Sequence, residues 1–433
     1  MRQTSLRRVA IIGGTRIPFC RANTAYAELG NRDMMTGALS ALVERFGLRS
    51  ECLGDVAIGA VINDSTDWNL AREVVLDSGL APQTPAFGIQ RACGTSLDAT
   101  LAIANKIAGG QIDAGIAGGV DTTSDVPIVY RKRFARRLLA TVRGHTLSKR
   151  TAAWKGFRLR ELKPEFPAVA EPRTGMSMGE HTERMAKEWA ISRVDQDMFA
   201  LASHRKAAAA YENGFYDDLV TAFHGVTRDN IVRADTSLET LSALPPVFDR
   251  SPAGTLTAGN STPLCDGASC VLLSNEAWAA ARNLPVQAYV SHAKVAAVNF
   301  VDDEGLLMAP AYAVPALLKD IGLELTDFDF YEIHEAFAAQ VLCTLSAWEN
   351  PTFCERYLGR SQALGTIDYA KLNVGGGSLA LGHPFAATGS RLVATLAKLL
   401  REKGTGRGLI SVCTAGGMGV AAVLEAARAK QIR

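Results

Sequence analysis

Short apolar runs alternate with longer stretches of helical periodicity over the first 126 residues of the chain. Four apolar runs predict buried strands, at 9–12, 55–60, 86–90 and 114–117. Three stretches between and after them predict helices, at 34–46, 70–78 and 96–108. Alternation of strands and helices predicts an α/β fold with a mostly parallel sheet.

The alternation stops between residues 127 and 252, where several prolines and one long helical pattern at 192–213 indicate an insertion. It then returns, with predicted strands at 286–291, 330–333, 408–414 and 419–424. The accompanying helices are predicted at 313–320, 336–347 and 388–400. We therefore predict an N-terminal half at 1–126 that is completed by 253–283, an inserted domain at 127–252, and a C-terminal half at 284–433.

Composition indicates a soluble globular protein, because 48% of the 433 residues are hydrophobic and the formal net charge is only +2. That charge argues against nucleic acid as a partner. However, residues 131–163 contain twelve Lys or Arg and one acidic residue, so this window carries +11 and the rest carries −9. The apolar run at 9–12 is too short for a secretion signal, and the stretch 336–348 is too short to span a membrane. We expect a cytoplasmic protein.

Eight cysteines are scattered through the chain without CxxC pairs, which fits neither a disulfide framework nor a structural zinc site. Cys93 lies in FGIQRACGTSLDAT, where an apolar run enters and a helical stretch leaves. This context predicts a strand-to-helix turn, and the N-terminus of a helix favours a thiolate nucleophile. Read alone, Cys93 is also explained as a buried cysteine that only fills space.

Three further reactive residues follow predicted strands or precede predicted helices. His383 precedes Pro384, which fixes a turn, so His383 is either a base for a thiol or a residue that caps a helix. Cys413 ends an apolar strand before a glycine turn whose N–H groups can receive an oxyanion. His334 ends another strand, and Glu335 is expected to open a helix. Because α/β folds place sites at such turns, we expect one shared site for acyl chemistry and no metal.

The sequence also contains a weak internal repeat, one copy in each half. A Gly-Gly pair, a strand and the sequence GGVD (118–121) follow Cys93, whereas a Gly-containing link, a strand and AGGMG (415–419) follow His383. Two copies of one α/β unit would explain this repeat.

Seven motifs resemble those of the thiolase family, in family order and over nearly the whole chain. They are TRIPF (15–19), RACGTS (91–96), MGEHTE (178–183), LTAGNSTPLCDGA (256–268), HEAF (334–337), GGGSLALGHPFAATG (375–389) and CTAGGMG (413–419). HEAF and GHPFAATG resemble the branch that contains the β subunits of fatty-acid-oxidation trifunctional complexes. The resemblance implies the thiolase fold, with two similar α/β halves, mixed sheets packed in layers, and an inserted loop domain covering the CoA groove.

The resemblance implies a catalytic role for each of the four reactive residues. Cys93 matches the nucleophile that becomes acylated, and His383 matches its activating base. Cys413 matches the acid/base that exchanges a proton with the leaving or incoming group. His334 matches the partner of His383 in a first oxyanion hole.

Other positions match the second oxyanion hole and the substrate groove. The backbone N–H groups of Cys93 and Ala415 match the hole that holds the acyl-enzyme oxygen. Met178, Ala258 and Thr262 match positions that line the CoA groove.

The implied reaction is thiolytic cleavage of 3-ketoacyl-CoA by CoA in fatty-acid β-oxidation, reversible and ping-pong through an acyl-cysteine. No cofactor is implied, since CoA is a substrate, and a homodimer or dimer of dimers is expected. One alternative is a biosynthetic, acetoacetyl-CoA-forming thiolase or another condensing enzyme. Cys413 argues against the ketoacyl synthases, which use a histidine or asparagine there. An alternative of another class is a catalytically idle subunit that docks a partner or a membrane.

The basic window predicts an amphipathic helix, because Tyr130, Phe134, Leu138 and Val142 recur every four residues among arginines and lysines. This pattern is consistent with peripheral membrane contact through 128–163, or with contact to an acidic partner. The resemblance adds an α subunit with hydratase and dehydrogenase activity as a candidate partner. The remaining alternative is a solvated cationic face that attracts the CoA phosphates.

Overall fold

The computed structural model describes residues 6–302 and 304–427. The first five residues of the predicted N-terminal half, residue 303 and the last six residues of the chain therefore lie outside the described part. Ten strands form one continuous sheet, and a separate two-stranded ribbon belongs to the insertion.

Four long strands of the N-terminal half lie in the order β3-β5-β8-β1. They are β1 (Val9–Arg16), β3 (Asp55–Gly59), β5 (Ala114–Asp121) and β8 (Cys265–Ser274). Two short strands, β4 (Ala86–Gly88) and β2 (Cys20–Arg21), extend the sheet beside β3 and β8. The helices of this half are α1 (Asn31–Arg45), α2 (Leu70–Asp77), α3 (Thr95–Ala108) and α9 (Glu276–Ala281).

The C-terminal half repeats this arrangement in the order β10-β11-β12-β9. Its strands are β9 (Ala288–Ala297), β10 (Phe330–Ile333), β11 (Arg407–Thr414) and β12 (Met418–Ala426). Its helices are α10 (Pro310–Ile321), α11 (Ala338–Glu349), α12 (Pro351–Leu358), α13 (Ser378–Leu381) and α14 (Thr388–Lys403). In both halves the first pair of strands is parallel and the next two pairs are antiparallel, which confirms two copies of one unit.

The prediction of a mostly parallel sheet is wrong. Within the described residues, only β3–β4, β3–β5 and β10–β11 pair in parallel in the main sheet. The antiparallel β1–β9 pair joins the two halves, and β8 returns to the sheet after the insertion. Hydrophobic periodicity predicts that a segment is a strand but does not fix its direction, so the mixed pairing followed only from the family resemblance.

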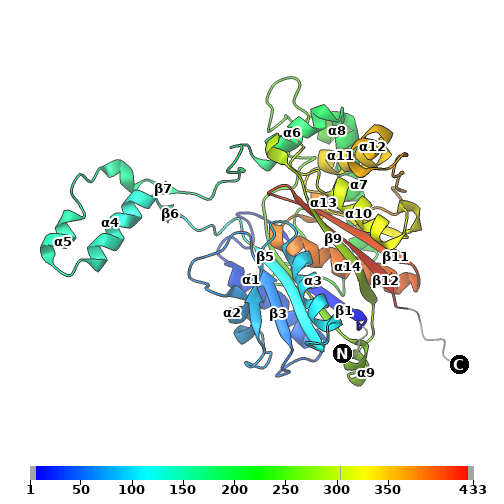
Figure 1. The fold of residues 1–433 in the computed structure, drawn as a ribbon, viewed down its shortest axis with the longest axis horizontal. Coiled ribbons are helices and arrows are strands. Elements are labelled where there is room, and N and C mark those ends of the chain that lie inside the picture. The colour runs from blue at the N-terminus through cyan, green and yellow to red at the C-terminus, as the bar shows by residue number, and fades with distance from the viewer. Residues whose placement is uncertain (1–5, 303, 428–433) are drawn as a thin grey trace.

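Helices α3 and α14 pack against each other at the centre of the molecule (Figure 1). Leu97 of α3 and Leu392 of α14 belong to the same buried cluster. A Cβ atom on Gly389 would lie only 2.2 Å from the backbone nitrogen of Leu97, so this approach requires glycine. Ser96 Oγ accepts a 2.8 Å hydrogen bond from the Ser390 N–H, which fixes the two helix N-termini side by side.

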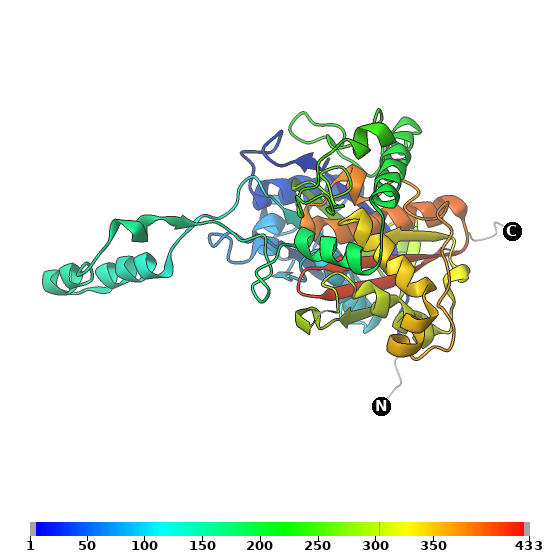
Figure 2. The same ribbon diagram turned by 90° about the horizontal axis from the view of Figure 1, so that it is seen from above.

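The insertion divides into a part that covers the body and a part that leaves it (Figures 1 and 2). The covering part contains α6 (Met178–Glu188), α7 (Arg193–Glu212) and α8 (Leu238–Ser242). The projecting part, called the arm below, spans residues 128–166. It contains β6 (Val129–Tyr130), α4 (Lys132–Arg143), α5 (Leu147–Ala152), the 3-10 turn η1 (Leu159–Leu162) and β7 (Pro164–Glu165).

Helix α4 confirms the predicted basic helix, but its aromatic face is not free. Phe134 is only 6% exposed and packs against Trp154 and Phe157, with ring centroids about 6 Å apart. The aromatic face of α4 thus forms a small hydrophobic core within the arm, because a helical hairpin that projects from the body must bury apolar side chains of its own. Val142 and Leu159 remain exposed.

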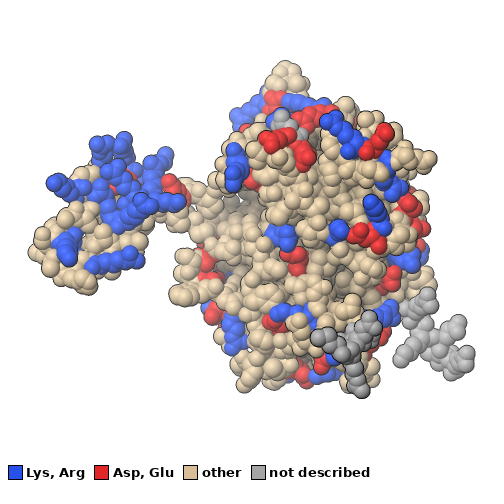
Figure 3. Space-filling model, in the orientation of Figure 1, with Lys and Arg blue, Asp and Glu red and all other residues tan. Residues whose placement is uncertain are grey.

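Charge separates the arm from the body. Figure 3 shows lysines and arginines crowded over the arm, whereas both signs of charge alternate over the body. Among the residues described, no helix is both long and apolar enough to cross a membrane.

Candidate functional site

Cys93 lies in a tight turn between β4 and α3, as the sequence predicts. Ala92, immediately before it, has φ 43°, a left-handed conformation that a non-glycine residue rarely adopts. Gly94 caps α3, which begins at Thr95. Strained backbone of this kind concentrates at functional sites, and here it turns the half-buried Cys93 thiol toward the C-terminal half.

The structure brings His383 to Cys93 from the opposite half. His383 Nε2 lies 3.1 Å from Cys93 Sγ, and His383 Nδ1 lies 2.6 Å from Thr388 Oγ1 at the start of α14. For Nε2 to accept the thiol proton, the neutral ring must carry its own proton on Nδ1, where the Thr388 hydroxyl accepts it. Thr388 is a functional residue that sequence reasoning missed, although a hydroxyl five residues after the histidine was visible.

Asp121, at the end of β5, holds the His383 turn in place. Its carboxylate accepts hydrogen bonds from the N–H groups of Ile62 at 2.7 Å and Ala386 at 2.8 Å. Burial raises the pKa of Asp121 to about 7, and these backbone donors oppose the shift. A Cβ atom on Gly119 would lie 2.1 Å from the carbonyl oxygen of Ala386, so glycine lets the turn rest directly on β5.

His334 lies beside His383, with ring centroids 4.1 Å apart. Arg391 Nη2 donates to Ser378 Oγ at 2.8 Å, and Ser378 Oγ lies 2.9 Å from His334 Nδ1. Because the arginine already donates to Ser378, the hydroxyl proton is available to His334 Nδ1, which assigns the ring proton to Nε2. His334 Nε2 is buried and has no hydrogen-bond partner among the described residues. The His334 Nε2–H is therefore a buried hydrogen-bond donor without an acceptor among the described residues.

Arg391 is itself fully buried, facing Glu332 at 3.7 Å. Sequence reasoning missed both Ser378 and Arg391, because nothing local relates them to His334. Arg391 follows the GHPFAATG motif by two residues, which was the one available signal.

Glu335 does not open a helix as expected, since α11 begins only at Ala338. Its buried carboxylate instead accepts hydrogen bonds from Ser203 Oγ at 2.7 Å, Asn373 Nδ2 at 2.6 Å and the Leu379 N–H at 3.1 Å. Glu335 therefore anchors the glycine-rich segment that precedes His383. Its carboxylate occupies the space that a side chain at Gly377 would need.

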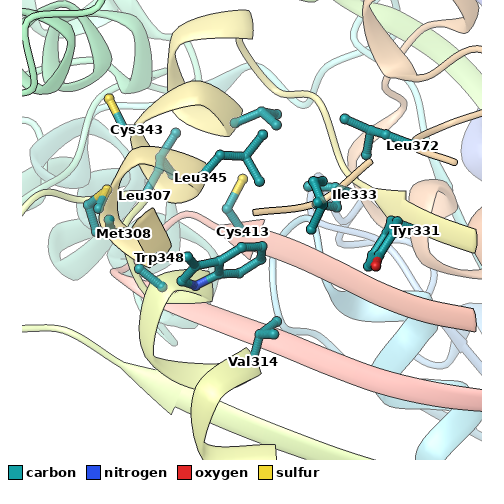
Figure 4. Close-up of a cluster of buried hydrophobic side chains, with 14 of the residues drawn as sticks. Leu307, Met308, Val314, Tyr331, Ile333, Cys343, Leu345, Trp348, Leu372 and Cys413 are labelled. Carbon is teal, nitrogen blue, oxygen red and sulfur yellow. The ribbon is translucent and has the colours of Figure 1, made fainter. Parts of the chain in front are cut away.

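Cys413 lies one residue before the end of β11, within the apolar core of the C-terminal half (Figure 4). Burial raises the pKa of the Cys413 thiol well above its ordinary value, the nearby Cys93 raises it further, and the Ala336 N–H opposes the shift. Figure 4 shows Cys413 near Ile333, the residue before His334. The structure thus brings all four predicted reactive residues to one place.

Ala415 begins the turn between β11 and β12, and its N–H points to the Cys93 sulfur. The N–H of Cys93 itself is the second donor near that sulfur. Glu171 of the insertion accepts the Gly416 N–H at 2.7 Å, which fixes the turn from outside. Two backbone donors at a nucleophile are the geometry of an oxyanion hole.

The nucleophile and base are neutral in the free protein. Burial raises the pKa of Cys93 to about 12, and the N–H groups of Ala415 and Cys93 only partly offset it. Burial lowers the pKa of His383 to about 3, and the charge of Arg391 lowers it further. Desolvation thus outweighs the helix N-terminus that the sequence interpretation invoked for a thiolate. The resting pair is a thiol and an imidazole.

The predicted groove residues are placed less uniformly. Thr262 donates both its N–H and its hydroxyl to the Ala336 carbonyl oxygen, at 3.1 and 3.0 Å, and the backbone of Ala336 also contacts Cys413. Met178 is half-buried at the start of α6 and packs on the core that contains Cys413. Ala258 is exposed in the loop before Thr262, and no described contact links it to the reactive residues.

Comparisons with known proteins agree with this geometry. The family model for the thiolase N-terminal domain matches residues 9–277, and that for the thiolase C-terminal domain matches residues 284–426. A 3-ketoacyl-CoA thiolase of Yersinia pestis (strain Pestoides F) is 41% identical over 424 residues, which cover 96% of this chain and 97% of the relative. A 3-ketoacyl-CoA thiolase of Yersinia pseudotuberculosis serotype O:1b (strain IP 31758) matches with the same identity and coverage.

A solved structure is also similar. The crystal structure of the Bacillus anthracis acetyl-CoA acetyltransferase superposes with a TM-score of 0.82 at 27% sequence identity. The match covers 98% of this chain and 100% of that structure.

Proposed function

Because the chain belongs to the thiolase family, we propose that it cleaves 3-ketoacyl-CoA with CoA to acetyl-CoA and a shortened acyl-CoA. The single observation that carries this proposal is the 3.1 Å contact between Cys93 Sγ and His383 Nε2 beside a second thiol, Cys413. The names of the 41%-identical relatives support the substrate class. Fatty-acid β-oxidation is the pathway in which this reaction fits.

In the first half-reaction, His383 Nε2 takes the thiol proton of Cys93 as the sulfur attacks the 3-keto carbonyl carbon. The negative charge moves onto the carbonyl oxygen, where the N–H groups of Cys93 and Ala415 stabilise it. Collapse of this intermediate breaks the Cα–Cβ bond and leaves the shortened acyl group on Cys93. The departing group is the enolate of acetyl-CoA.

The enolate requires a donor at its oxygen and a proton at its carbon. The Nε2–H of His334, together with protonated His383, supplies the hydrogen bonds at the thioester oxygen. Cys413 donates its thiol proton to the carbon, which completes acetyl-CoA and leaves a Cys413 thiolate. The raised pKa of Cys413 makes its thiolate a strong base.

In the second half-reaction, the Cys413 thiolate takes the proton of the incoming CoA thiol. The CoA sulfur then attacks acyl-Cys93, and His383 returns its proton to the departing Cys93 sulfur. Every group recovers its starting protonation state, so the cycle is ping-pong and reversible. No cofactor takes part, since CoA enters as a substrate. Thr262, Met178 and Ala258 line the pantetheine path in this proposal.

CoA-dependent consumption of acetoacetyl-CoA and of longer 3-ketoacyl-CoA thioesters tests the activity directly. Turnover of at least one chain length is expected, with acetyl-CoA as a product. A purified protein that cleaves none of them, at any CoA concentration, would contradict the proposal and favour an idle docking subunit. Net synthesis without measurable thiolysis would favour a condensing enzyme instead.

We further propose a homodimer, or a dimer of dimers, that forms through the β4 edge of the sheet. Strand β4 ends the strand order, so one side of it has no partner strand within the described residues. Nearby Trp68 is 98% exposed. An open edge beside an exposed tryptophan is typical of an interface. Sedimentation of the full chain should give a mass of twice or four times the monomer.

For the arm we propose a docking role at an anionic membrane surface, which would make the cytoplasmic protein peripheral. Its cations are held away from the body, and Val142 and Leu159 provide exposed apolar contacts, at 80% and 78% exposure. Cationic charge with apolar anchors is the combination that binds lipid surfaces. Flotation with anionic vesicles at low salt is the test. Failure to float, with capture by a hydratase/dehydrogenase subunit, would assign the arm to an α-subunit partner instead.

A further inference from the structure

Three potential metal ligands converge at the active site. The Cys93 sulfur and one ring nitrogen each of His334 and His383 all lie within 4.8 Å of one another. His334 Nε2 is fully buried and has no partner among the described residues. We propose that these three residues bind a zinc-class divalent cation when no acyl substrate is present, and that the bound cation inhibits the enzyme. The inhibitory part of this inference rests on the proposed thiolase function.

The geometry needs only small adjustment. Zinc binds sulfur at about 2.3 Å and imidazole nitrogen at about 2.0–2.1 Å, so tetrahedral ligand atoms lie about 3.4–3.6 Å apart. Cys93 Sγ and His383 Nε2 are 3.1 Å apart, and the third atom lies within 4.8 Å of both. Opening the first distance by about half an ångström and closing the others admits the ion.

His383 is already oriented as a metal ligand is, whereas His334 must first move its ring proton from Nε2 to Nδ1. A ligating histidine usually bonds its second nitrogen to a neighbour, which fixes the ring. Thr388 Oγ1 lies 2.6 Å from His383 Nδ1, and Ser378 Oγ lies 2.9 Å from His334 Nδ1. His383 thus directs Nε2 to Cys93 Sγ at 3.1 Å, and one ring nitrogen of His334 lies within 4.8 Å of both atoms.

The proton balance is simple. The cation replaces the thiol proton of Cys93, which leaves to solvent, and a metal–sulfur bond forms. The proton on His334 Nε2 is replaced by one on Nδ1, where Ser378 Oγ accepts it, so this ring stays neutral. His383 keeps its Nδ1 proton. One thiolate and two imidazoles favour zinc, cadmium or cobalt over magnesium or calcium, which prefer oxygen ligands.

Inhibition follows because the cation draws electron density from the Cys93 sulfur, which lowers its nucleophilicity, and occupies His383 Nε2, which the reaction needs as its base. The acylated enzyme has no thiolate to offer, so prior acylation should protect against the ion. The site is thus inhibitory, and the proposed reaction itself uses no metal.

Cobalt(II) provides a readout that is independent of turnover, because cobalt bound to a thiolate has an intense charge-transfer absorption. The chelator-treated full chain should bind one Co²⁺ per chain with this absorption, and Zn²⁺ should displace it. Cys93→Ser should abolish the band. His334→Asn should weaken Co²⁺ binding strongly, because it removes one of the three ligands. Cys52→Ser removes the one exposed cysteine and should change nothing.

Several results would overturn the proposal. They are a band that survives in Cys93→Ser, one that disappears in Cys52→Ser, and unchanged affinity in His334→Asn. Zn²⁺ that binds at this site without slowing acetoacetyl-CoA cleavage would refute the inhibition. A chain that shows the cobalt band at Cys93 but no cleavage of any 3-ketoacyl-CoA would contradict the proposed function and leave the metal site standing.

Discussion

The catalytic centre and the arm use charged and apolar side chains in opposite ways. At the centre, the reactive imidazoles are buried and held by specific partners, as His383 is by Thr388 and His334 is by Ser378. On the arm, cations are exposed and crowded, and the aromatic core around Phe134 serves only to hold the hairpin together. Chemistry at a fixed atom requires fixed partners, whereas attraction of an anionic surface requires only charge that reaches it.

The comparison predicts that substitutions at the centre change turnover and that substitutions on the arm do not. The largest effect is expected for Cys93→Ser, because a serine hydroxyl beside a neutral histidine is a much weaker nucleophile than a thiol. We expect kcat for acetoacetyl-CoA cleavage to fall at least about a thousandfold. Cys52→Ser is the matched control and should retain full activity. A Cys93→Ser protein within tenfold of the parent would remove Cys93 from the mechanism.

The second-largest effect is expected for Ser378, which does not contact substrate in the proposed mechanism but acts through His334. Ser378→Ala removes the hydroxyl that fixes the ring proton on Nε2. Loss of one oxyanion donor costs on the order of a hundredfold in kcat, and we expect that loss with little change in KM. Ser390→Ala alters a buried serine of α14 that does not contact His334, and should cost only a few-fold in kcat. Equal effects from the two variants would argue against the Arg391–Ser378 relay.

A smaller loss of activity, with a loss of stability, is expected at the contact between α3 and α14. Gly389→Ala places a Cβ 2.2 Å from the Leu97 nitrogen, so the two helices must separate. We expect destabilisation of about 1–3 kcal/mol, measured by denaturant unfolding, and a several-fold lower kcat. Gly88→Ala meets no atom within 4 Å and is the control. Unchanged stability in Gly389→Ala would show that the helices are free to adjust.

The pH dependence of Cys93 alkylation tests the neutral pair without changing any residue. The pKa of Cys93 is raised to about 12 and that of His383 is lowered to about 3, so the pair holds one proton at all pH values between them. With a pKa of about 12, the Cys93 thiolate is a small fraction that grows about tenfold per pH unit. Iodoacetamide labelling of Cys93 should therefore rise about tenfold per pH unit from about pH 6 to about pH 10 without levelling off, unlike labelling of a free thiol with a pKa of about 8.5. A rate that stays constant from about pH 6 to about pH 9 would show a preformed thiolate–imidazolium pair and contradict the neutral pair.

The smallest effect on turnover is expected on the arm. Replacement of Arg136, Arg143 and Lys149 by glutamine lowers the exposed charge without touching the aromatic core. Flotation with anionic vesicles should be lost, while kcat and KM for acetoacetyl-CoA should stay within about twofold. A large rise in KM would instead assign these cations to attraction of the CoA phosphates.

The sequence located the reactive residues because their local context is distinctive. Cys93 and His383 each precede a helix in a turn marked by glycine or proline, and Cys413 precedes a glycine turn. Such features depend on neighbours in the chain, so they are readable from one sequence. The repeated α/β unit was readable for the same reason.

Contacts between segments that lie far apart in the chain could not be predicted from the sequence. Asp121 holds the Ala386 turn from 265 residues away, and Glu335 anchors a loop that it precedes by about 40 residues. The direction of the strands and the inward turn of Phe134 also depend on tertiary packing. The four-residue period of the arm fits a lipid-facing helix and a helical hairpin equally well, because both bury one face of α4.

The central claim is that Cys93 carries the acyl group, and mass spectrometry of the acylated protein tests it most directly. The full chain is incubated with acetoacetyl-CoA in the absence of added CoA, quenched in acid and digested. The account predicts one acetyl group on the peptide that contains Cys93, removed when CoA is added before the quench. An acetyl group found on Cys413 or another cysteine instead, or one that CoA does not remove, would contradict it.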